Sequence, residues 1–440
     1  MGFLRDAAQT FALQAAAAAL QVVANVLLSR ELGTDGRGVY ELLTLLPTIA
    51  VYVASLGFGN AAMRFVAKEP RRDGAAAGSS LLVGVLGGLL VATAFLPFFE
   101  PLRRFIGGGC PPLALWLALA AIPILTLELH AGLFLTGQQA ILPGNVAKTL
   151  QVAAALAGTV ALVAFDALTP TNAVAIWAAS FALGAALAWR WSLARLATPL
   201  SLARDLIRGG LAFGLRFFGG NLALFLLFRV DLWFVRAFRN LDEVGIYGQA
   251  TKLAILYQMS ARAIERAFVP RVLQADAAQA TELTTRTTRC FLIVMGFAAL
   301  LLGLAAFPLV PLLFGDPFAA AAGQLAWLLP GIVIANVGIL ANGDLMSRGL
   351  PSAGSLAAIV CLAANVAINL FAIPRWGADG AAASSGVCYA AYGLLMARHY
   401  ARSTSSRVAD LLLPRPADFA AVRSLVQRAL GRLAGRSNAS

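Results

Sequence analysis

The stretch Asn369-Leu-Phe-Ala-Ile-Pro374-Arg-Trp-Gly377-Ala-Asp-Gly380-Ala-Ala-Ala-Ser384 decides the fold of this 440-residue chain. It lies between two apolar runs that are each long enough to cross a bilayer. Proline stops a helix, glycine permits a tight turn, and alanine lets a returning helix pack closely on its neighbours. The stretch therefore predicts a helix that ends at Pro374, a turn on Gly377 and Gly380, and a second membrane helix.

The composition excludes a soluble domain. Hydrophobic residues make up 60% of the chain and charged residues 12%, and the mean hydropathy is +0.78. Apolar runs of about 20 residues recur along nearly the whole chain. We therefore expect an all-α integral membrane protein with twelve transmembrane helices in two six-helix repeats around a central cavity. The predicted spans are 7–28, 39–62, 76–98, 113–136, 146–165, 172–191, 211–235, 246–266, 289–313, 324–346, 354–373 and 380–399.

The basic residues indicate the orientation. If the N-terminus starts in the cytoplasm, most of the 34 lysine and arginine residues fall on the cytoplasmic side of the predicted spans. This distribution predicts that both termini are cytoplasmic, and it explains the net charge of +13. Nucleic-acid binding would need a soluble basic face, so we expect no nucleic acid as a partner. The four cysteines are scattered and no histidine cluster accompanies them, so we expect neither disulfides nor a metal site.

The chain repeats itself at an offset of about 207 residues. The segment 30–40, with Gly33, Gly38 and Tyr40, corresponds to 236–247, with Gly245 and Tyr247, and Leu-Pro-Gly at 142–144 corresponds to Leu-Pro-Ser at 350–352. Parallel repeats of this kind hold substrate between two halves that rock against each other. The predicted domains are an N-terminal lobe (1–191), a cytoplasmic linker (192–210), a C-terminal lobe (211–400) and a basic cytoplasmic tail (401–440).

Several short motifs carry a family resemblance. The pattern Asn-x4-Pro-x-x-Gly-x-x-Gly-Ala-Ala at 369–382 resembles the signature of polysaccharide biosynthesis exporters, the oligosaccharide flippase family, in the multidrug/oligosaccharidyl-lipid/polysaccharide flippase superfamily. Further segments look like the same family in order and spacing: 28–33 with 38–40, 56–64, 231–235 and 243–247. The chain departs from the family at Ser55-Leu56, where an acidic residue is frequent, and it lacks the two further helices of lipid II flippases.

The resemblance implies a transport function. The expected activity is flipping of a polyprenyl-diphosphate-linked oligosaccharide across the bacterial inner membrane by alternating access, for polysaccharide or O-antigen (lipopolysaccharide) biosynthesis. The expected partners are the lipid-linked glycan, membrane lipids, and a glycosyltransferase or polysaccharide polymerase. No cofactor is expected, although transport could be coupled to an ion, either a proton or sodium.

Cations in or near the predicted spans are candidates for binding the diphosphate. A charge at the bilayer centre costs about 2.5–3.5 kcal/mol, so each needs a partner or a watery cavity. Arginine suits the task because its guanidinium bonds phosphate oxygens in pairs. Arg262 and Arg266 could instead be anchors that reach to lipid headgroups, and both interpretations stay open. The candidate substrate-binding residues are Arg216, Arg229, Lys252, Arg262, Arg266 and Gln249.

Other polar residues are candidates for a wet cavity or for ion coupling. Gln21 and Asn25 share one face of the first span, and Glu41 begins a polar stripe on the second. Such stripes line aqueous cavities but also join helices in lipid. Glu128 lies two residues from His130 and could relay protons, although an interhelical hydrogen bond is the simpler interpretation. The coupling or cavity candidates are Glu41, Glu128, Asp231, Asp344, Gln21 and Asn25.

The remaining motifs are interpreted structurally. Turns and close helix packing are expected at Gly33, Gly38, Gly245, Pro374, Gly377 and Gly380. The residues Phe419, Val422, Leu425, Val426, Leu430 and Leu433 would form one apolar face of a basic amphipathic helix in the tail. Such a helix would lie on the anionic inner leaflet or dock a glycosyltransferase.

Two other function classes remain in competition with a glycan flippase. A cation-coupled multidrug extruder would share the fold, but it is expected to present carboxylates on the first helix, and this chain has none there between Asp6 and Glu31. The second competing class is a scaffold protein of a glycan assembly complex, which would not transport a substrate. An enzyme is not expected, because the outer loops are short and no cluster of reactive residues or nucleotide motif is found.

Overall fold

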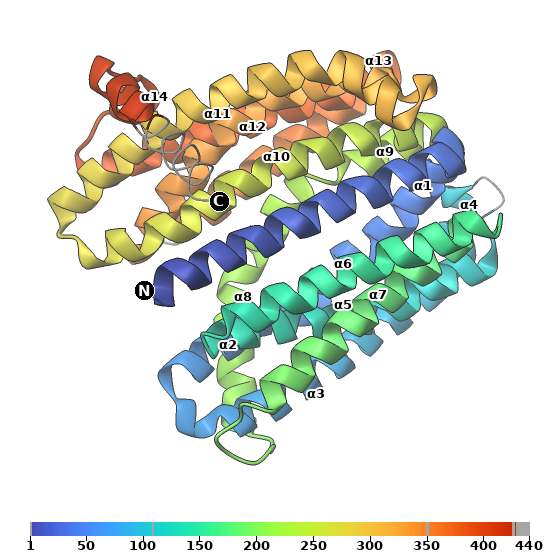
Figure 1. The fold of residues 1–440 in the computed structure, drawn as a ribbon, viewed down its shortest axis with the longest axis horizontal. Helices are drawn as coiled ribbons and strands as arrows, with labels where there is room; N and C mark the ends of the chain where they lie inside the picture. The colour runs from blue at the N-terminus through green and yellow to red at the C-terminus, as the bar shows by residue number, and fades with distance from the viewer. Residues whose placement is uncertain (1, 108–109, 349–351, 425–426, 428–440) are drawn as a thin grey trace, which may run out of the picture. The chain divides into compact units, whose positions relative to one another are not determined.

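The computed structural model describes residues 2–107, 110–348, 352–424 and 427, without the side chains of 2–8, 11, 217, 259–271, 273–274, 346–347 and 352–353. Throughout this part of the chain the regular structure is helical, which confirms the predicted all-α class (Figure 1). The α-helices are α1 (Gly2–Ser55), α2 (Phe58–Lys68), α3 (Asp73–Ala94), α4 (Phe99–Ile106), α5 (Pro112–Gly137), α6 (Ile141–Ala164), α7 (Pro170–Leu193), α8 (Arg204–Leu227), α9 (Asp231–Phe238), α10 (Leu241–Gln274), α11 (Ala277–Phe314), α12 (Ala320–Ser347), α13 (Ser352–Thr404) and α14 (Val408–Leu412).

The helices are long and apolar enough for a multi-pass membrane protein. Within the described residues, eight can cross a bilayer, or nine if the pair in α8 that is bent by 48° counts as one span. The apolar segments of α1 and α13 are 44 and 51 residues long, about twice the ~20 residues that one span needs. Dividing each of them in two, and adding the 34-residue α10, gives a count consistent with the predicted twelve spans.

Both long helices bend at a single glycine. Gly33 has φ 65° and ψ −174°, and Gly377 has φ 58° and ψ −142°. The first helix of the C-terminal pair does not end at Pro374 as predicted, because the helix continues to the residue before Gly377, and Gly380 lies inside the next helix. Proline removes only one helical hydrogen bond, whereas glycine can reach positive φ and reverse the chain.

Two predicted spans are interrupted. The span predicted at 39–62 breaks at Leu56 and Gly57, which have φ 44° and 75°. A carbon added at Gly57 would lie 2.9 Å from the Gly214 Cα, so the break accompanies a close crossing of α8. The span predicted at 211–235 breaks at 228–230, between α8 and α9. Hydropathy does not reveal either break, because most of the residues around both are apolar.

The described chain divides into two compact units. Unit 1 comprises Met1–Leu226, Leu232–Gly248 and Pro311–Phe318, and unit 2 comprises Leu227–Asp231, Gln249–Val310 and Ala319–Ser440. The predicted lobes, 1–191 and 211–400, divide the sequence elsewhere and stay a prediction.

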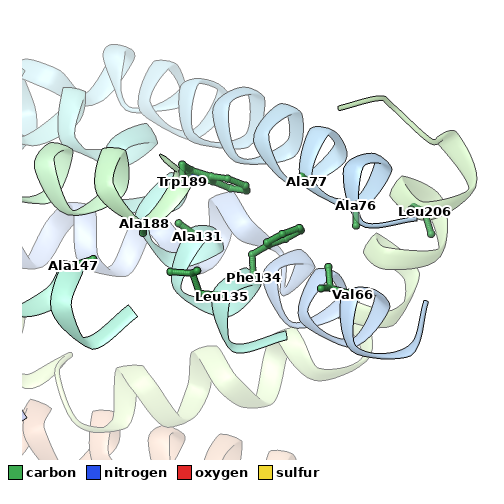
Figure 2. Packing of buried hydrophobic residues seen from close by; sticks show 10 residues of the cluster. All are labelled: Val66, Ala76, Ala77, Ala131, Phe134, Leu135, Ala147, Ala188, Trp189 and Leu206. Atoms are coloured by element: carbon green, nitrogen blue, oxygen red, sulfur yellow. The ribbon is translucent and has the colours of Figure 1, made fainter. Parts of the chain in front are cut away.

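Unit 1 has an apolar core between α2, α3, α5 and α7 (Figure 2). Phe134 of α5 and Trp189 of α7 lie with ring centroids 5.6 Å apart, and the Trp189 indole donates to the Leu127 carbonyl at 3.0 Å. The same cluster contains Val66, Leu135 and Leu206 and five small residues, Ala76, Ala77, Ala131, Ala147 and Ala188. Small side chains let helix backbones approach closely, which is how helices associate when lipid surrounds them. In unit 2, α12 packs along α13 (Figure 1).

Glycines also permit the start of α10 to cross α1 inside unit 1. A carbon added at Gly38 would lie 2.1 Å from the Leu241 carbonyl oxygen, and one added at Gly245 would lie 2.0 Å from the Thr34 carbonyl oxygen. The Thr34 hydroxyl donates to Asp242 at the same crossing. Residues 241–248 therefore pack directly against the segment that follows the Gly33 bend. The same test at Gly380 gives 2.6 Å to the Ala372 carbonyl oxygen, within α13.

We expect Gly245→Ala to lower the amount of folded protein in the membrane, because the added carbon meets the Thr34 carbonyl oxygen at 2.0 Å. Overpacking of this kind costs about 1–3 kcal/mol. The measurement is the monodisperse fraction of a fluorescent fusion after detergent extraction. Gly296→Ala is the matched control, since nothing lies within 4 Å of its added carbon. Equal folded fractions for both variants would contradict the close-packing explanation.

Candidate functional site

Arg37 and Glu41 form a buried ion pair in α1. Their side chains are 0% and 4% exposed, and Arg37 Nη2 lies 3.0 Å from Glu41 Oε1. The residues are four apart, so both lie on one face of the helix. Arg37 also donates to Asn25 Oδ1, and its guanidinium lies 5.0 Å from the centroid of the Tyr40 ring. The bend at Gly33 makes this possible, because it folds the segment of Asn25 back along the segment of Arg37.

The structure thus joins two predicted cavity residues, Glu41 and Asn25, through an arginine that we had assigned to an outer loop. The i,i+4 spacing of Arg37 and Glu41 was the available sequence signal. Gly248 of α10 covers the pair, since a carbon added there would lie 2.7 Å from Glu41 Cγ. The Nε and Nη1 atoms of Arg37 are buried without a hydrogen-bond partner in the described structure. Because the two charges offset each other, breaking the pair would leave a buried charge uncompensated.

A second buried polar cluster lies in unit 2, around Asp231. The Ser385 hydroxyl donates to Asp231 Oδ2 at 2.8 Å, and Asn365 Nδ2 donates to Ser385 Oγ at 3.2 Å. Asn369 Nδ2 donates to Asn365 Oδ1 at 3.0 Å, and Ser384 donates to Asn369. All five residues are buried. The Gly377 bend brings Ser384 and Ser385 opposite Asn365 and Asn369.

The cluster has the chemistry of a site for a hard cation. Carboxylate, amide and hydroxyl oxygens are the ligands that such ions prefer. Asp231 was a predicted coupling residue, whereas Asn365 and Ser385 were missed. The signal for them was a pair of asparagines four residues apart before the turn and adjacent serines after it. Within the described residues no group of three or more His, Cys, Asp or Glu side chains could hold a metal ion.

The break between α8 and α9 places Arg229 outside regular helix, where its side chain is half-buried. Next to it, the Phe228 ring packs against the Tyr389 ring in a tilted arrangement with ring centroids 4.4 Å apart. These two rings, with Thr251 and Gln258 of α10, line a cavity of about 10 Å³. Discontinuous helices are where transporters bind substrates and ions, because the freed backbone groups face a ligand or water.

The other predicted cations lie in different settings. Gln249 is fully buried and Lys252 is half-buried, both on α10 in unit 2. Arg216 is exposed on α8 in unit 1. The side chains of Arg262 and Arg266 lie outside the described residues. In the first span, Gln21 is exposed, and Gln14 donates to Asn145 of α6 at 3.2 Å. That end of the polar stripe therefore joins two helices.

Glu128 and His130 do not face each other. Glu128 Oε1 lies 3.4 Å from Lys148 Nζ on α6. His130 is buried, and its ring nitrogens lie 3.0 Å from the Ser55 hydroxyl and 3.0 Å from the Ser80 carbonyl oxygen. Residues that are two positions apart on a helix point about 200° away from each other, so Glu128 and His130 each find a partner on another element. The geometry matches the interpretation of interhelical contacts. It does not place Glu128 and His130 together in a proton relay.

Asp344 lies at the end of α12 and is satisfied locally. Arg348 donates to it at 2.8 Å, and the hydroxyls of Tyr400 and Thr284 donate at 2.6 and 3.0 Å. Asp344 was a predicted coupling or cavity residue. Its carboxylate is already paired with Arg348, four residues further along the chain, and its role in a cavity stays a prediction.

We expect Arg37→Ala and Glu41→Ala each to lower the melting temperature of the purified protein by several degrees. Removing one partner of a buried pair costs about 3–5 kcal/mol, because the other charge stays buried. The free energy of unfolding of the double variant should fall by less than the sum of the two single decreases, and the difference should be at least about 1 kcal/mol. The same cycle on Lys148 and Glu128, whose side chains are 50% and 24% exposed, should show little coupling. Additive losses at Arg37 and Glu41 would contradict a structural ion pair.

Comparison with known proteins places the chain in a family. The probable low-salt glycan biosynthesis flippase Agl15 of Haloferax volcanii is 21% identical over 416 residues, which cover 92% of this chain and 84% of that protein. An inward-facing multidrug resistance MATE family transporter of the MOP superfamily has a TM-score of 0.75 at 15% identity, with 88% of this chain and 94% of that chain covered. Lipid II flippase MurJ, in an inward closed conformation, has a TM-score of 0.70 at 12% identity, with 91% and 88% covered.

The two structural likenesses show the fold. Residues 3–276, more than half of the chain, match the family described as polysaccharide biosynthesis protein. The resemblance that the sequence motifs indicated is thereby confirmed: the chain belongs to the polysaccharide biosynthesis protein family.

Proposed function

We propose that this protein is a flippase that moves a polyprenyl-diphosphate-linked oligosaccharide across the inner membrane by alternating access. The observation that carries the proposal is the family match over residues 3–276. The similarity to a probable glycan biosynthesis flippase over 92% of the chain supports it further. A multi-pass helical fold shared with MOP-superfamily transporters is suited to moving a large polar group through a bilayer.

The charges support an anionic substrate. Arg229 lies at the break between α8 and α9, and Lys252 lies half-buried on α10 in the same unit. We propose that these two residues hold the diphosphate; Arg216, predicted for the same role, lies exposed on α8 in unit 1. The sugar would cross through water-filled space, and the polyprenyl tail would stay in the bilayer. Lysine and arginine side chains suit this role, because their N–H groups donate to phosphate oxygens.

We also propose that the Asp231 cluster binds the coupling cation. Its oxygens come from a carboxylate, two amides and two hydroxyls, all buried. Those ligands suit sodium, and the Asp231 carboxylate could equally accept a proton. The cluster is two residues from Arg229, so a cation bound there would act directly on the proposed phosphate site. This proximity is a physical route by which ion binding could bias substrate binding.

A multidrug extruder of the same superfamily is the competing function, and the fold alone does not separate the two. The first helix has no carboxylate between Asp6 and Glu31. A cavity for cationic drugs needs negative charge, whereas the candidate substrate-binding residues here are mainly basic. Expression in a drug-sensitive host measures this alternative directly. Protection of the host against several cationic drugs would favour the extruder.

Membrane location and partners follow from the proposal. The distribution of basic residues supports cytoplasmic termini in a bacterial inner membrane. A glycosyltransferase would supply the substrate inside, and a polysaccharide polymerase would use it outside. A reporter fused after the last residue tests the orientation, and a periplasmic signal would contradict it.

We expect Lys252→Ala to abolish translocation of lipid-linked glycan in vesicles without changing the protein level. Lys252→Arg should keep part of the activity, because it preserves the charge but changes the donor geometry. The readout is glycan accessibility to a glycosidase added on one side of the membrane. Arg208→Ala, which removes an exposed cation of α8, is the matched control and should transport normally. Normal translocation in the Ala variants of Lys252, Arg229 and Arg216 alike would show that the diphosphate is held elsewhere.

For the coupling site, we expect Asp231→Asn to remove the dependence of translocation on the cation gradient. Asparagine keeps the shape and one oxygen but loses the charge that holds a cation. The measurement compares transport with and without imposed sodium and proton gradients. Asp205→Asn, an exposed carboxylate of α8, is the control. Unchanged gradient dependence in Asp231→Asn would exclude this cluster as the coupling site.

A further inference from the structure

A cavity of about 630 Å³ lies in unit 2, away from Asp231 and Arg229. It is bounded by the first turns of α11, the residue after α12, the end of α13, and the tail around α14. Four arginines line it, Arg286, Arg289, Arg348 and Arg415, together with hydroxyl side chains that include Thr281 and Ser403. None of these residues takes part in the proposed transport site.

The floor of the cavity is fixed by a buried ion pair. Arg289 Nε lies 2.6 Å from Asp418 Oδ2, and the two side chains are 8% and 3% exposed. Arg289 also donates to the Asp410 carbonyl oxygen at 2.6 Å, and Leu411 between these contacts is fully buried. Burial acts to raise the pKa of the Asp418 carboxyl, but hydrogen bonds from Arg289 and the Arg415 backbone outweigh it and hold that pKa below its usual range. The tail around α14 is therefore held in place by these contacts and forms one wall of the cavity.

The rim of the cavity is basic. Arg286 is exposed, and the Arg415 side chain is 59% exposed where it pairs with Asp410 at 2.5 Å. Four arginines and two carboxylates, Glu282 and Asp410, line the space. Exposed guanidinium groups over a rigid floor are suited to the oxygens of a phosphate group.

The surface of α11 shows where a ligand would approach. An exposed apolar ridge on this helix starts at Val294 and includes Phe297 and Leu304, each of the latter 62% exposed. At 100° per residue, Arg286 lies within about 20° of both Phe297 and Leu304. Arg286 and Val294 are eight residues apart, or about 12 Å along the axis. A headgroup layer is about 5–8 Å thick, and an arginine side chain spans the remaining distance.

We propose that this cavity binds the phosphate of an anionic phospholipid whose acyl chains lie along the α11 ridge. Basic pockets at the ends of membrane helices recognise acidic headgroups in this way. The ridge favours a lipid over a soluble anion, because Arg286 of the rim and the apolar ridge lie on the same side of α11. The proposal does not depend on what the protein transports.

The test uses the purified full-length chain in detergent and measures the affinity for short-chain lipids by calorimetry. Dioctanoyl phosphatidylglycerol should bind at least ten-fold more tightly than dioctanoyl phosphatidylcholine. Arg286→Gln should reduce the phosphatidylglycerol affinity several-fold, and Arg286→Gln with Arg415→Gln by more than ten-fold. Neither change should alter the phosphatidylcholine affinity. Arg208→Gln, an exposed cation on α8, is the matched control and should leave both affinities unchanged.

Equal affinities for the two lipids would overturn the proposal, as would a double variant that binds like the unaltered chain. Inorganic phosphate that competes as well as the lipid would also overturn it, because the site would then serve a soluble anion. Each variant is first compared with the unaltered chain by size exclusion and melting temperature. If the double variant does not fold, the single Arg286→Gln variant decides, since the exposed side chain of Arg286 takes no part in the Arg289 floor.

Discussion

Hydrocarbon offers no hydrogen-bond partner to the backbone, and this constraint governs the structure. The described chain meets it with helices, in which each segment satisfies its own N–H and C=O groups. The same constraint applies to side chains, because a charge in lipid needs a partner. Arg37 is paired with Glu41 at 3.0 Å, and Asp344 with Arg348 at 2.8 Å. Each pair is four residues apart on its own chain segment, so it can form without help from a distant helix.

Glycine supplies what regular helices cannot. Gly33 and Gly377 reverse the chain with positive φ, and each reversal brings distant polar residues together. At Gly33 the result is the contact of Asn25 with Arg37, and at Gly377 it is the cluster of serines and asparagines at Asp231. The bends therefore do more than connect helices: they set the register in which buried polar groups find partners. A side chain at either position would be strained, so the clusters depend on the absence of one.

Much of the fold could be predicted because hydropathy and turn chemistry are local properties. Apolar runs of spanning length, the bends at Gly33 and Gly377, and the family motifs can all be read within short windows of sequence. The burial of charged residues could not be. Arg37 lies between two predicted spans and Asp344 was a predicted cavity residue, and the burial of both is set by helices far away in the sequence. The breaks at Gly57 and at 228–230 were missed as well, since most of the residues around them are apolar despite Arg229 and Asp231.

The helix break at 228–230 has no evident benefit for the stability of the fold. A continuous helix from α8 into α9 would satisfy every backbone group, and most of the residues on either side of the break are apolar. The interruption instead puts a cation, Arg229, outside helical structure and starts α9 at Asp231, whose carboxylate is bonded to Ser385 across 154 residues of sequence. Positions where a chain departs from its own local preferences are commonly those that function requires. An ion at Asp231 and a phosphate at Arg229 would act on the same few residues. In a regular helix two residues that are two positions apart point about 200° away from each other, and the interruption removes that constraint.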